Sequence, residues 1–259
     1  MKTLSIFNEK GGTGKTTLSA MLADYLCYEK GEPVRVFDMD APSFHFQSLR
    51  NDDKNILEGI TSSDGSFIKA VKSAGKEPYP IVSWDIKKHP ASEIIKVVNE
   101  LRSPSLPGYC LFDFSGSYDP ADPAHIFICN GLLDMLAIPV DTDSESSQSA
   151  FYLAKLIASQ LKDAPEIKRP ITTAFWNRIF TNDEQRAFSS ISTTSGFLEM
   201  MGITVLNTKV RSHRSLMSRP RSLNFLRQTM CYPASRVRSY CPSLEEFFDE
   251  LLSLLNQPK

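Results

Sequence analysis

The sequence predicts an α/β fold: a single domain, residues 1–259, in which helices flank a doubly wound, mostly parallel sheet. Short apolar runs alternate along the chain with segments whose apolar residues recur at helical spacing. Several of these runs end in aspartate, asparagine or a glycine-rich turn, and parallel sheets bind ligands at the carboxyl ends of their strands. The length fits one domain, because α/β folds of up to ~250 residues commonly form one.

Composition, cysteine content and hydropathy argue against an exported, disulfide-bonded or membrane-spanning protein. With 41% hydrophobic and 23% charged residues and a formal net charge of -1, the chain is typical of a globular protein, and its total charge indicates no partner. The odd number of cysteines and the absence of a C-x-x-C pair favour a reducing compartment; the cysteines are Cys27, Cys110, Cys129, Cys231 and Cys241. Without a signal-like start or an apolar run of ~18 residues, we expect a cytoplasmic protein that does not span a membrane.

A glycine-rich turn follows the first apolar run. Residues Lys10 to Thr17 read Lys-Gly-Gly-Thr-Gly-Lys-Thr-Thr, between a strand-like run at Leu4 to Phe7 and a helix-like run at Leu18 to Leu26. Such a turn points backbone N–H groups at a phosphate beside the positive end of the next helix. Lys15 is expected to reach the β- and γ-phosphates and Thr16 to bind Mg²⁺. The predicted nucleotide-binding residues are Gly11, Gly12, Thr13, Gly14, Lys15, Thr16 and Thr17.

The turn departs from the general phosphate-loop pattern, because Glu9 stands where that pattern has glycine and Lys10 follows it. This K-G-G-x-G-K-[ST] form resembles the deviant Walker A motif of the ParA/MinD family of P-loop ATPases. The resemblance implies that Lys10 reaches across a dimer interface to the nucleotide bound by the other subunit. The alternative is a glycine-rich turn with two solvated lysines, which the flanking strand, the flanking helix and two later acidic motifs disfavour.

A second strand is predicted at Val34 to Phe37, and it ends in Asp38 and Asp40. Carboxylates at this end of a parallel strand face the nucleotide crevice. Asp40 resembles the aspartate of the family's D-x-D-P-Q motif, which implies that it positions the attacking water and belongs to the magnesium shell. The agreement is partial, because Ala41 stands where the family often has proline and the glutamine is missing. The alternative is a capping or turn aspartate.

Residues 43–88 are polar and lack a sustained period, so they predict no function. One or two helices and a strand at Tyr79 to Trp84 fit the pattern there. The apolar residues that suggest the helices are Ile56, Ile60, Phe67, Ile68 and Val71.

A helix at Ile94 to Leu101 is followed by an apolar run at Tyr109 to Asp113 that ends in a carboxylate, as in a Walker B motif. There the aspartate holds magnesium through water. Many strands end in aspartate, so the value of Asp113 lies in its order, third after the phosphate loop and Asp40. Phe114-Ser115-Gly116-Ser117 follows, whereas the family usually has a proline-containing loop that senses the γ-phosphate.

The next strand is predicted at Leu133 to Val140, followed by an acidic, serine-rich loop at Asp141 to Ser149 and a helix at Ala150 to Leu161. A further strand at Ile171 to Trp176 ends in Asn177. The resemblance implies that Asn177 recognises the adenine edge, and an ordinary turn residue is the alternative.

The last strand is expected at Met201 to Leu206, with Asn207 to Val210 passing near the base. Leu244 to Leu255 has one apolar helical face, and its polar face is acidic. A helix that binds a membrane surface favours Lys and Arg there. We therefore expect a closing helix packed on the sheet rather than a membrane-targeting tail.

A basic stretch runs from Lys209 to Arg238, and no Asp or Glu occurs between Glu199 and Glu245. Arginine suits phosphate oxygens through its planar fork, so we expect DNA binding with little sequence preference. The alternatives are a solvated basic surface, or arginines paired with the acidic loop at Asp141 to Glu145 or with the acidic last helix. The candidate DNA-binding residues are Arg211, Arg214, Arg219 and Arg221.

The resemblance covers nearly the whole chain and implies an ATP-dependent homodimer that hydrolyses ATP with Mg²⁺. Lys10, Lys15 and Asp40 would be catalytic, and Thr16, Asp40 and Asp113 would hold the metal. Members act as switches in DNA partition or in conjugative transfer and mobilisation, with a DNA-binding adaptor or a mobilisation protein as a further partner. Three alternatives stay open: a MinD-like positioning ATPase for a non-DNA cargo, a metal-cluster carrier, and a ligase of the dethiobiotin-synthetase type. The first needs a basic amphipathic tail, the second clustered cysteines, and the third lacks a counterpart of Lys10.

Overall fold

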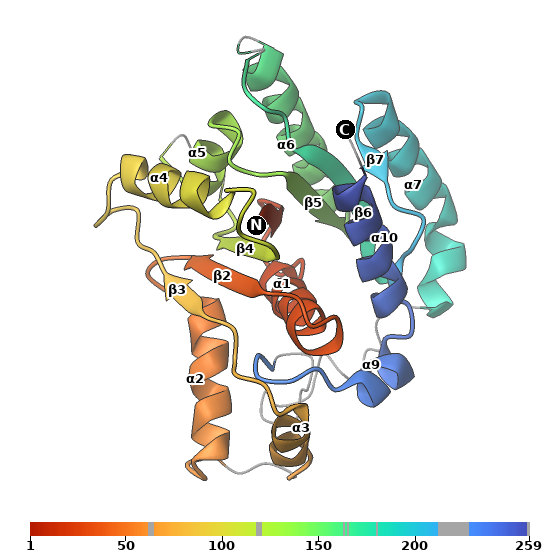
Figure 1. Ribbon diagram of the computed structural model, residues 1–259. Coiled ribbons are helices and arrows are strands. Elements are labelled where there is room, and N and C mark those ends of the chain that lie inside the picture. Colours follow the sequence, from red (N-terminus) through yellow and green to blue (C-terminus); the bar gives the residue numbers. More distant parts are fainter. Residues whose placement is uncertain are drawn as a thin grey trace.

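Eight strands form one open sheet in the computed structural model (Figure 1). The structure describes residues 1–61, 65–117, 121–162, 164, 166–179, 181–211 and 228–257. The strands are β1 (Lys2–Ile6), β2 (Val34–Met39), β3 (Ile81–Ser83), β4 (Tyr109–Phe114), β5 (Met135–Val140), β6 (Ile171–Ile179), β7 (Thr204–Val205) and β8 (Val210–Arg211). All pairings within these ranges are parallel. The predicted α/β fold with a mostly parallel sheet is confirmed.

The strand order is β3-β2-β4-β1-β5-β6-β7, and β8 pairs with β6. β1 lies in the middle, with β4 on one side and β5 on the other. The chain therefore reverses its direction of winding beside β1, and open parallel sheets bind ligands outside the carboxyl ends of the strands at such a switch point. The segments that follow β1, β4 and β5 all meet there.

Helices cover both faces of the sheet. They are α1 (Lys15–Asp24), α2 (His45–Leu57), α3 (Ser66–Ala74), α4 (Ala91–Leu101), α5 (Pro123–Cys129), α6 (Ser144–Lys162), α7 (Thr181–Met200), α9 (Ala234–Tyr240) and α10 (Leu244–Asn256). One core joins α1, α2, α9 and α10 to the sheet, and a second core joins α4, α5, α6 and α7 to its other face. Figure 1 shows α4, α5 and α6 above the sheet and α1, α2 and α3 below it.

Neighbouring strand residues divide between these cores as the pleat requires. Ile6 belongs to the first core and Phe7 to the second, and Leu111 and Phe112 divide in the same way. Both faces are thus apolar, which is why the strands read as continuous apolar runs instead of an alternating pattern.

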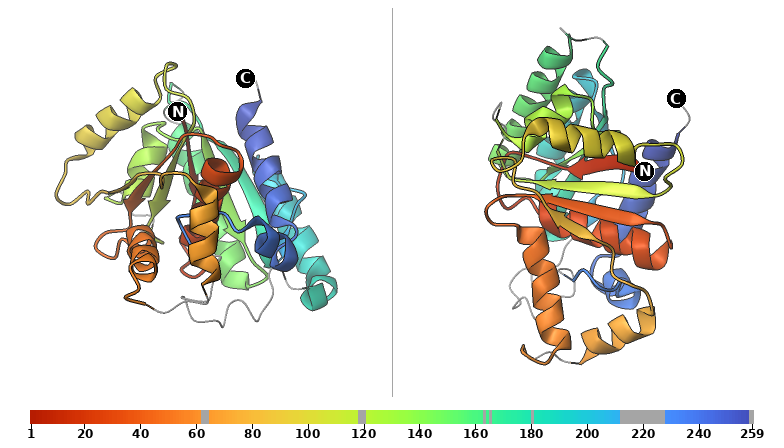
Figure 2. Two further views of the ribbon diagram at one scale, coloured as in Figure 1. Left: turned by 60° about the horizontal axis from the view of Figure 1, so that its bottom comes forward. Right: turned by 60° about the vertical axis from the view of Figure 1, so that its left-hand side comes forward.

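The region without a clear sequence pattern contains both expected helices, α2 and α3, and the expected strand, β3. α2 and α3 extend away from the sheet (Figure 2). A small third core lies between them and the segment that leads to α9. Its buried members are Ile56, Phe67, Met230 and Cys231.

Several segments differ from the expectation. α6 begins at Ser144, inside the loop that was predicted at Asp141–Ser149. Only Asp141 to Asp143 therefore remain as a short turn before the helix. A carboxylate oxygen of Asp143 accepts the N–H of Glu145 at 3.1 Å, which caps the helix earlier than the apolar pattern indicates. α5 and α7 lie where no helix was predicted. The last strand shrinks to β7, because Met201 and Gly202 form the turn that ends α7.

The C-terminal helix is confirmed as a closing helix. Its apolar face is buried on the sheet, and the Phe247 ring packs 4.3 Å from the Phe175 ring of β6. Its acidic face binds the chain itself, since Glu250 accepts the backbone N–H groups of Asn207 and Thr208 at 2.8 and 2.9 Å. Across the described ranges, no helix has both the length and the apolar character needed to cross a bilayer.

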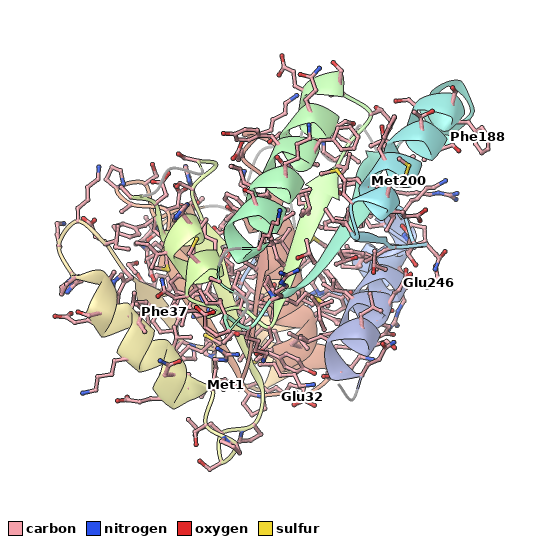
Figure 3. The ribbon with its side chains drawn as sticks, turned by 90° about the horizontal axis from the view of Figure 1, so that it is seen from above. Met1, Glu32, Phe37, Phe188, Met200 and Glu246 are labelled. Carbon is pink, nitrogen blue, oxygen red and sulfur yellow. The ribbon has the colours of Figure 1, made fainter. Side chains whose placement is uncertain are left out.

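Large apolar side chains are unevenly buried. Phe37 lies inside the second core, whereas Phe188 and Met200 on α7 are 66% and 76% exposed. Figure 3 shows these two side chains at the outer side of α7, on the opposite side of the molecule from Phe37. The exposed apolar surface of α7 therefore lies far from the edge that β3 forms.

Candidate nucleotide-binding site

The phosphate loop connects β1 to α1 at the switch point of the sheet. Gly12 and Gly14 have φ of 76° and 88°, a backbone conformation that other residues rarely adopt. A side chain added at Gly11 or Gly12 would meet nothing within 4 Å, so the loop surface is open to a ligand. Lys15, Thr16 and Thr17 form the first turn of α1, whose N–H groups lack intrahelical acceptors. The loop thus offers the expected donors for phosphate.

Lys15 points back into this loop. Its side chain is 8% exposed, and Nζ donates to the Lys10 carbonyl at 2.9 Å. Burial lowers the pKa of the Lys15 ammonium, and the charges of Asp113 and Asp40 oppose that shift. The ammonium therefore lies among the loop N–H groups and two carboxylates, where it can reach the phosphates of a bound nucleotide.

Asp113 lies at the carboxyl end of β4 and is fully buried. Among the described residues, neither of its carboxylate oxygens has a hydrogen-bond partner. Burial raises the pKa of Asp113 to about 8, although the Thr16 hydroxyl and Lys15 lower it in part. A buried carboxylate without a partner beside a hydroxyl is the hard oxygen donor set that Mg²⁺ requires, so these residues fit the metal.

The two aspartates at the carboxyl end of β2 have different contacts. Asp38 accepts the backbone N–H of Gln47 at 2.8 Å and that of Asp40 at 3.2 Å, so it fixes the start of α2. Asp40 instead points its carboxylate at α2, where Oδ2 pairs with Nδ1 of His45. The capping alternative therefore describes Asp38. His45 could not be identified from the sequence, because residues 43–88 show no periodic pattern.

The loop after β4 touches the phosphate loop. A Cβ at Gly116 would lie 2.9 Å from the Glu9 carbonyl oxygen and 3.2 Å from Nζ of Lys15. Any other residue there would strike the backbone of the phosphate loop, which explains the glycine in a segment that lacks the family's proline. Glu9 itself has Oε1 buried without a partner in the described structure, and burial raises its pKa.

Lys10 is held by its own chain. Nζ forms ion pairs with Asp143 and, at 3.2 Å, with Glu145, both at the start of α6. The sequence left open that arginines pair with these acids. In the structure, Lys10 pairs with Asp143 and Glu145. The signal that could have found the pair is topological: β5 adjoins β1, so the residues that follow the two strands are neighbours.

Asn177 and Arg178 close the other side of the loop. Nδ2 of Asn177 donates to the Thr13 carbonyl at 2.7 Å, and Nη1 of Arg178 donates to the Gly12 carbonyl at 2.8 Å. Adenine recognition by Asn177 stays a prediction. Arg178 was not identified from the sequence as a site residue.

Of the four candidate DNA-binding residues, the structure describes Arg211. Arg214, Arg219 and Arg221 lie outside the described residues. Arg211 is exposed on β8, where its N–H donates to Ser243. Arg238, from the same basic stretch, pairs with Glu29 at 3.1 Å and with Glu245 of α10 at 2.9 Å. For that arginine, pairing with the acidic last helix is confirmed.

None of the five cysteines forms a disulfide. Within the described part of the chain, no group of three or more His, Cys, Asp or Glu side chains could hold a metal ion. The described residues therefore offer no cysteine cluster of the kind a metal-cluster carrier uses.

Comparison with solved structures supports the fold. The MinC:MinD cell division protein complex of Aquifex aeolicus superposes with a TM-score of 0.66 at 17% identity, covering 100% of this chain and 97% of that one. Apo McdA of Cyanothece gives 0.62 at 18% identity, covering 99% and 100%. A ParA family ATPase of Chlorobium tepidum gives 0.61 at 16% identity, covering 96% and 98%. No curated protein sequence matches significantly.

A family model matches most of the sequence as well. The model describes the CobQ/CobB/MinD/ParA nucleotide binding domain, and it aligns with residues 4–230. The match includes the phosphate loop, both acidic strand ends and Asn177. The chain therefore belongs to the CobQ/CobB/MinD/ParA family of nucleotide-binding domains, as a ParA/MinD-type protein.

Proposed function

We propose that this protein is an ATPase whose ATP-bound form is a homodimer and that it acts as a switch on DNA, in partition or in conjugative transfer. The observation that carries the enzymatic part is the Asp113 carboxylate, which is buried beside Thr16 and Lys15 and has no hydrogen-bond partner within the described part of the chain. A native fold rarely keeps such a group unless a ligand supplies the missing interaction. Magnesium with the phosphates of ATP supplies it.

Each residue of the site has a role in this reaction. Lys15 neutralises charge that develops on the β- and γ-phosphate oxygens as the bond between them breaks. Asp40, oriented by His45, positions the attacking water. Thr16, Asp40 and Asp113 would hold Mg²⁺, which would supply further charge neutralisation when bound. Gly116 brings the loop after β4 close enough to Lys15 to respond to the γ-phosphate.

Lys10 supports the dimer. Two carboxylates hold its ammonium at the mouth of the site, and hydrogen bonding to Asp143 raises its pKa, so it is a fully charged cation. In the proposed dimer Lys10 exchanges these carboxylates for the phosphates bound by the other subunit. The ion pair is exposed, so its loss costs little.

The first experiment measures ATP binding, ATP hydrolysis and light scattering. Wild type should bind Mg·ATP and release phosphate, and Asp40→Ala should bind ATP without turning it over and accumulate as a dimer. Lys15→Ala should bind no nucleotide. If Asp40→Ala loses ATP affinity as completely as Lys15→Ala, its assigned role is wrong; if ATP leaves Asp40→Ala monomeric, the dimer is wrong.

DNA is the cargo that the charge distribution favours. The stretch between Glu199 and Glu245 carries arginines and lysine without any acid, in a chain whose net charge is -1. Packing of α10 against the sheet buries the apolar face that a membrane-positioning ATPase would need for its tail. A dimer would double the basic stretch.

The second experiment measures binding to duplex DNA at several salt concentrations. The ATP-loaded protein should bind with a log–log salt slope of roughly 0.9 per phosphate neutralised. Replacing Arg219 and Arg221 together with Ala should weaken binding to all sequences alike and flatten the slope, while ATP hydrolysis without DNA stays unchanged. Unaltered DNA binding by this double variant would remove the basic stretch from the mechanism.

A further inference from the structure

Thr229 lies in the basic stretch, and other parts of the chain bind all of its polar groups. Its N–H and its hydroxyl both donate to Oδ2 of Asp53, at 2.6 and 2.8 Å. Arg50 donates from Nε to the Thr229 hydroxyl at 2.9 Å and from Nη2 to the Thr229 carbonyl at 3.0 Å. The Tyr28 hydroxyl donates to the same carbonyl at 3.3 Å. Thr229 is fully buried, so these contacts hold it in one place.

The contacts of Thr229 belong to a buried polar cluster that also includes Asp24, Arg50, Asp53 and Tyr79. Arg50 and Asp53 lie one turn apart on α2. Nη1 of Arg50 donates to the Tyr79 carbonyl at 3.0 Å, and its guanidinium carbon lies 4.8 Å from the centre of the Tyr79 ring. The Tyr79 hydroxyl donates at 3.0 Å to Asp24, the last residue of α1. The cluster therefore joins α1, α2 and the basic stretch.

Stability alone does not account for this buried polar cluster. Carboxylates and a guanidinium are costly to remove from water, and apolar residues of the same volume are often at least as stable as a buried ion pair. An apolar core already lies beside the cluster, where Met230 and Cys231 pack with Ile56 of α2. A satisfied network of directed hydrogen bonds, in contrast, specifies a single arrangement. The cluster thus fixes where the chain lies at Thr229.

Both helices that reach the cluster begin at the nucleotide-binding site. α1 starts at Lys15, in the phosphate loop. The start of α2 is set by Asp38, which accepts a backbone N–H of its first turn, and by the pair of Asp40 with His45. The 13 residues of α2 span about 20 Å as one stiff element. A nucleotide in the loop would therefore act on the starts of two helices whose other parts hold the basic stretch.

We propose that Arg50 and Asp53 are positioning residues for DNA binding: through Thr229 they make the placement of the basic stretch depend on the nucleotide at the phosphate loop. The inference rests on the proposed function, because it requires the basic stretch to bind DNA. It goes beyond that function by assigning the link between the two sites to α1, α2 and the buried polar cluster.

The test measures affinity for a fluorescent duplex DNA with and without Mg·ATP. Asp53→Asn and Thr229→Val keep the shape of the side chain and remove a charge or a hydroxyl from the cluster. In wild type Mg·ATP should raise DNA affinity, and in both variants this gain should shrink on the order of 10-fold, within the usual range of coupling between two sites. Thr229→Ser keeps the hydroxyl and should retain the gain.

Other measurements separate positioning from folding and from catalysis. Phosphate release without DNA and ATP-dependent dimerisation in light scattering should stay at the wild-type level, because neither substituted residue lies in the phosphate loop. Asn51→Ala, at an exposed position of α2, is the matched control and should leave the gain unchanged. Asp134→Asn disrupts an ion network that shares no residue with the cluster, so it should keep the gain even when its melting temperature falls as far.

Hydrogen exchange tests the link without DNA. In wild type Mg·ATP should slow exchange of the Thr229 N–H by a larger factor than exchange of the Asp134 N–H, which is bound to Thr3. Equal factors at the two N–H groups would overturn the link between the sites.

The DNA measurements distinguish the two proposals. If Asp53→Asn and Thr229→Val keep the full wild-type gain, the positioning role is wrong and the proposed function stands. If wild type with ATP binds no DNA at low salt, the DNA function and the positioning role are both wrong.

Discussion

Two aspartates, one fully buried and one partly buried, lie at opposite ends of the parallel strands and differ in their partners. Asp113, at the carboxyl end of β4, has no hydrogen-bond partner among the described residues, and burial raises its pKa to about 8. Asp134 directly precedes β5, at the opposite end of the strands. There it pairs with Arg102 and Lys168 and accepts the Thr3 N–H at 2.8 Å. Burial opposes its charge, yet hydrogen bonds from Lys168 and Thr3 and the charge of Arg102 lower its pKa to about 2.

The different partners point to a stabilising role for Asp134 and to the proposed ligand-binding role for Asp113. At the amino end of the strands, other parts of the chain supply partners for the Asp134 carboxylate. The ion network that results holds β1, β5 and the segment before β6 together. At the carboxyl end of the strands, the residues that the structure describes leave the Asp113 carboxylate unsatisfied, which costs stability and is retained where a ligand completes the set. Substitutions at the two edges should therefore have opposite consequences.

The largest difference is expected between two lysines. Lys15→Ala removes a buried ammonium that faces the phosphates, so affinity for ATP should fall on the order of 10²–10³-fold or below detection. Lys168→Ala, at the opposite edge, should bind ATP like wild type while its melting temperature falls. Calorimetric titration with Mg·ATP measures both. Equal affinities in the two variants would place the nucleotide elsewhere.

A loss of similar size is expected in turnover. Lys10→Ala should keep its ATP affinity but lower the rate of phosphate release by ~10³-fold, the usual cost of removing a cation that acts from a second subunit. Asp143→Ala, which removes the partner that holds Lys10 in its own chain, should leave the rate at least as high as in wild type. Normal turnover by Lys10→Ala would contradict the cross-subunit role.

Stability should change in opposite directions when the two aspartates are neutralised. Asp134→Asn breaks a partly buried ion network and should lower the free energy of unfolding by about 2 kcal/mol. Asp113→Asn removes a buried carboxylate without a partner and should raise that free energy by about 1 kcal/mol in the absence of ligand. Urea unfolding at neutral pH measures both values. Destabilisation of the same size in both variants would show that Asp113 is partnered in solution.

The smallest effect concerns acid. The folded-state pKa of Asp134 is about 2 against 3.8 unfolded, so its contribution, on the order of 2 kcal/mol, is present above the unfolded value. It should be lost as the pH falls from about 4 toward 2. Comparison of wild type with Asp134→Asn over this range isolates the contribution: the stability gap should close at low pH. A constant gap would remove the ionised carboxylate from the network.

The parts of the site that could be predicted are those encoded locally. The phosphate loop is one continuous segment, and Asp40 and Asp113 each end an apolar run. Partners that depend on strand order could not be read in this way. Lys10 and Asp143 are 133 residues apart, and Asn177 and Thr13 are 164 apart.

Other features depend on fine backbone detail. The left-handed φ of Arg178 has no sequence signature, because arginine is rare in that conformation. Asp143 as the cap of α6 could have been recognised from the acidic and serine-rich turn, but the apolar pattern placed the helix start at Ala150. The overall fold was predictable because both faces of the sheet are covered, which gives long apolar runs separated by helices.

The most direct test of the central claim is phosphate release from ATP by wild type and by Asp113→Asn, each with Mg²⁺ and with the metal chelated. The account predicts release by wild type that requires Mg²⁺, and at least ~10-fold slower release by Asp113→Asn although that variant is the more stable protein. Hydrolysis by Asp113→Asn at the wild-type rate, or the same wild-type rate after chelation, would contradict the claim that the unpartnered carboxylate of β4 marks the catalytic site.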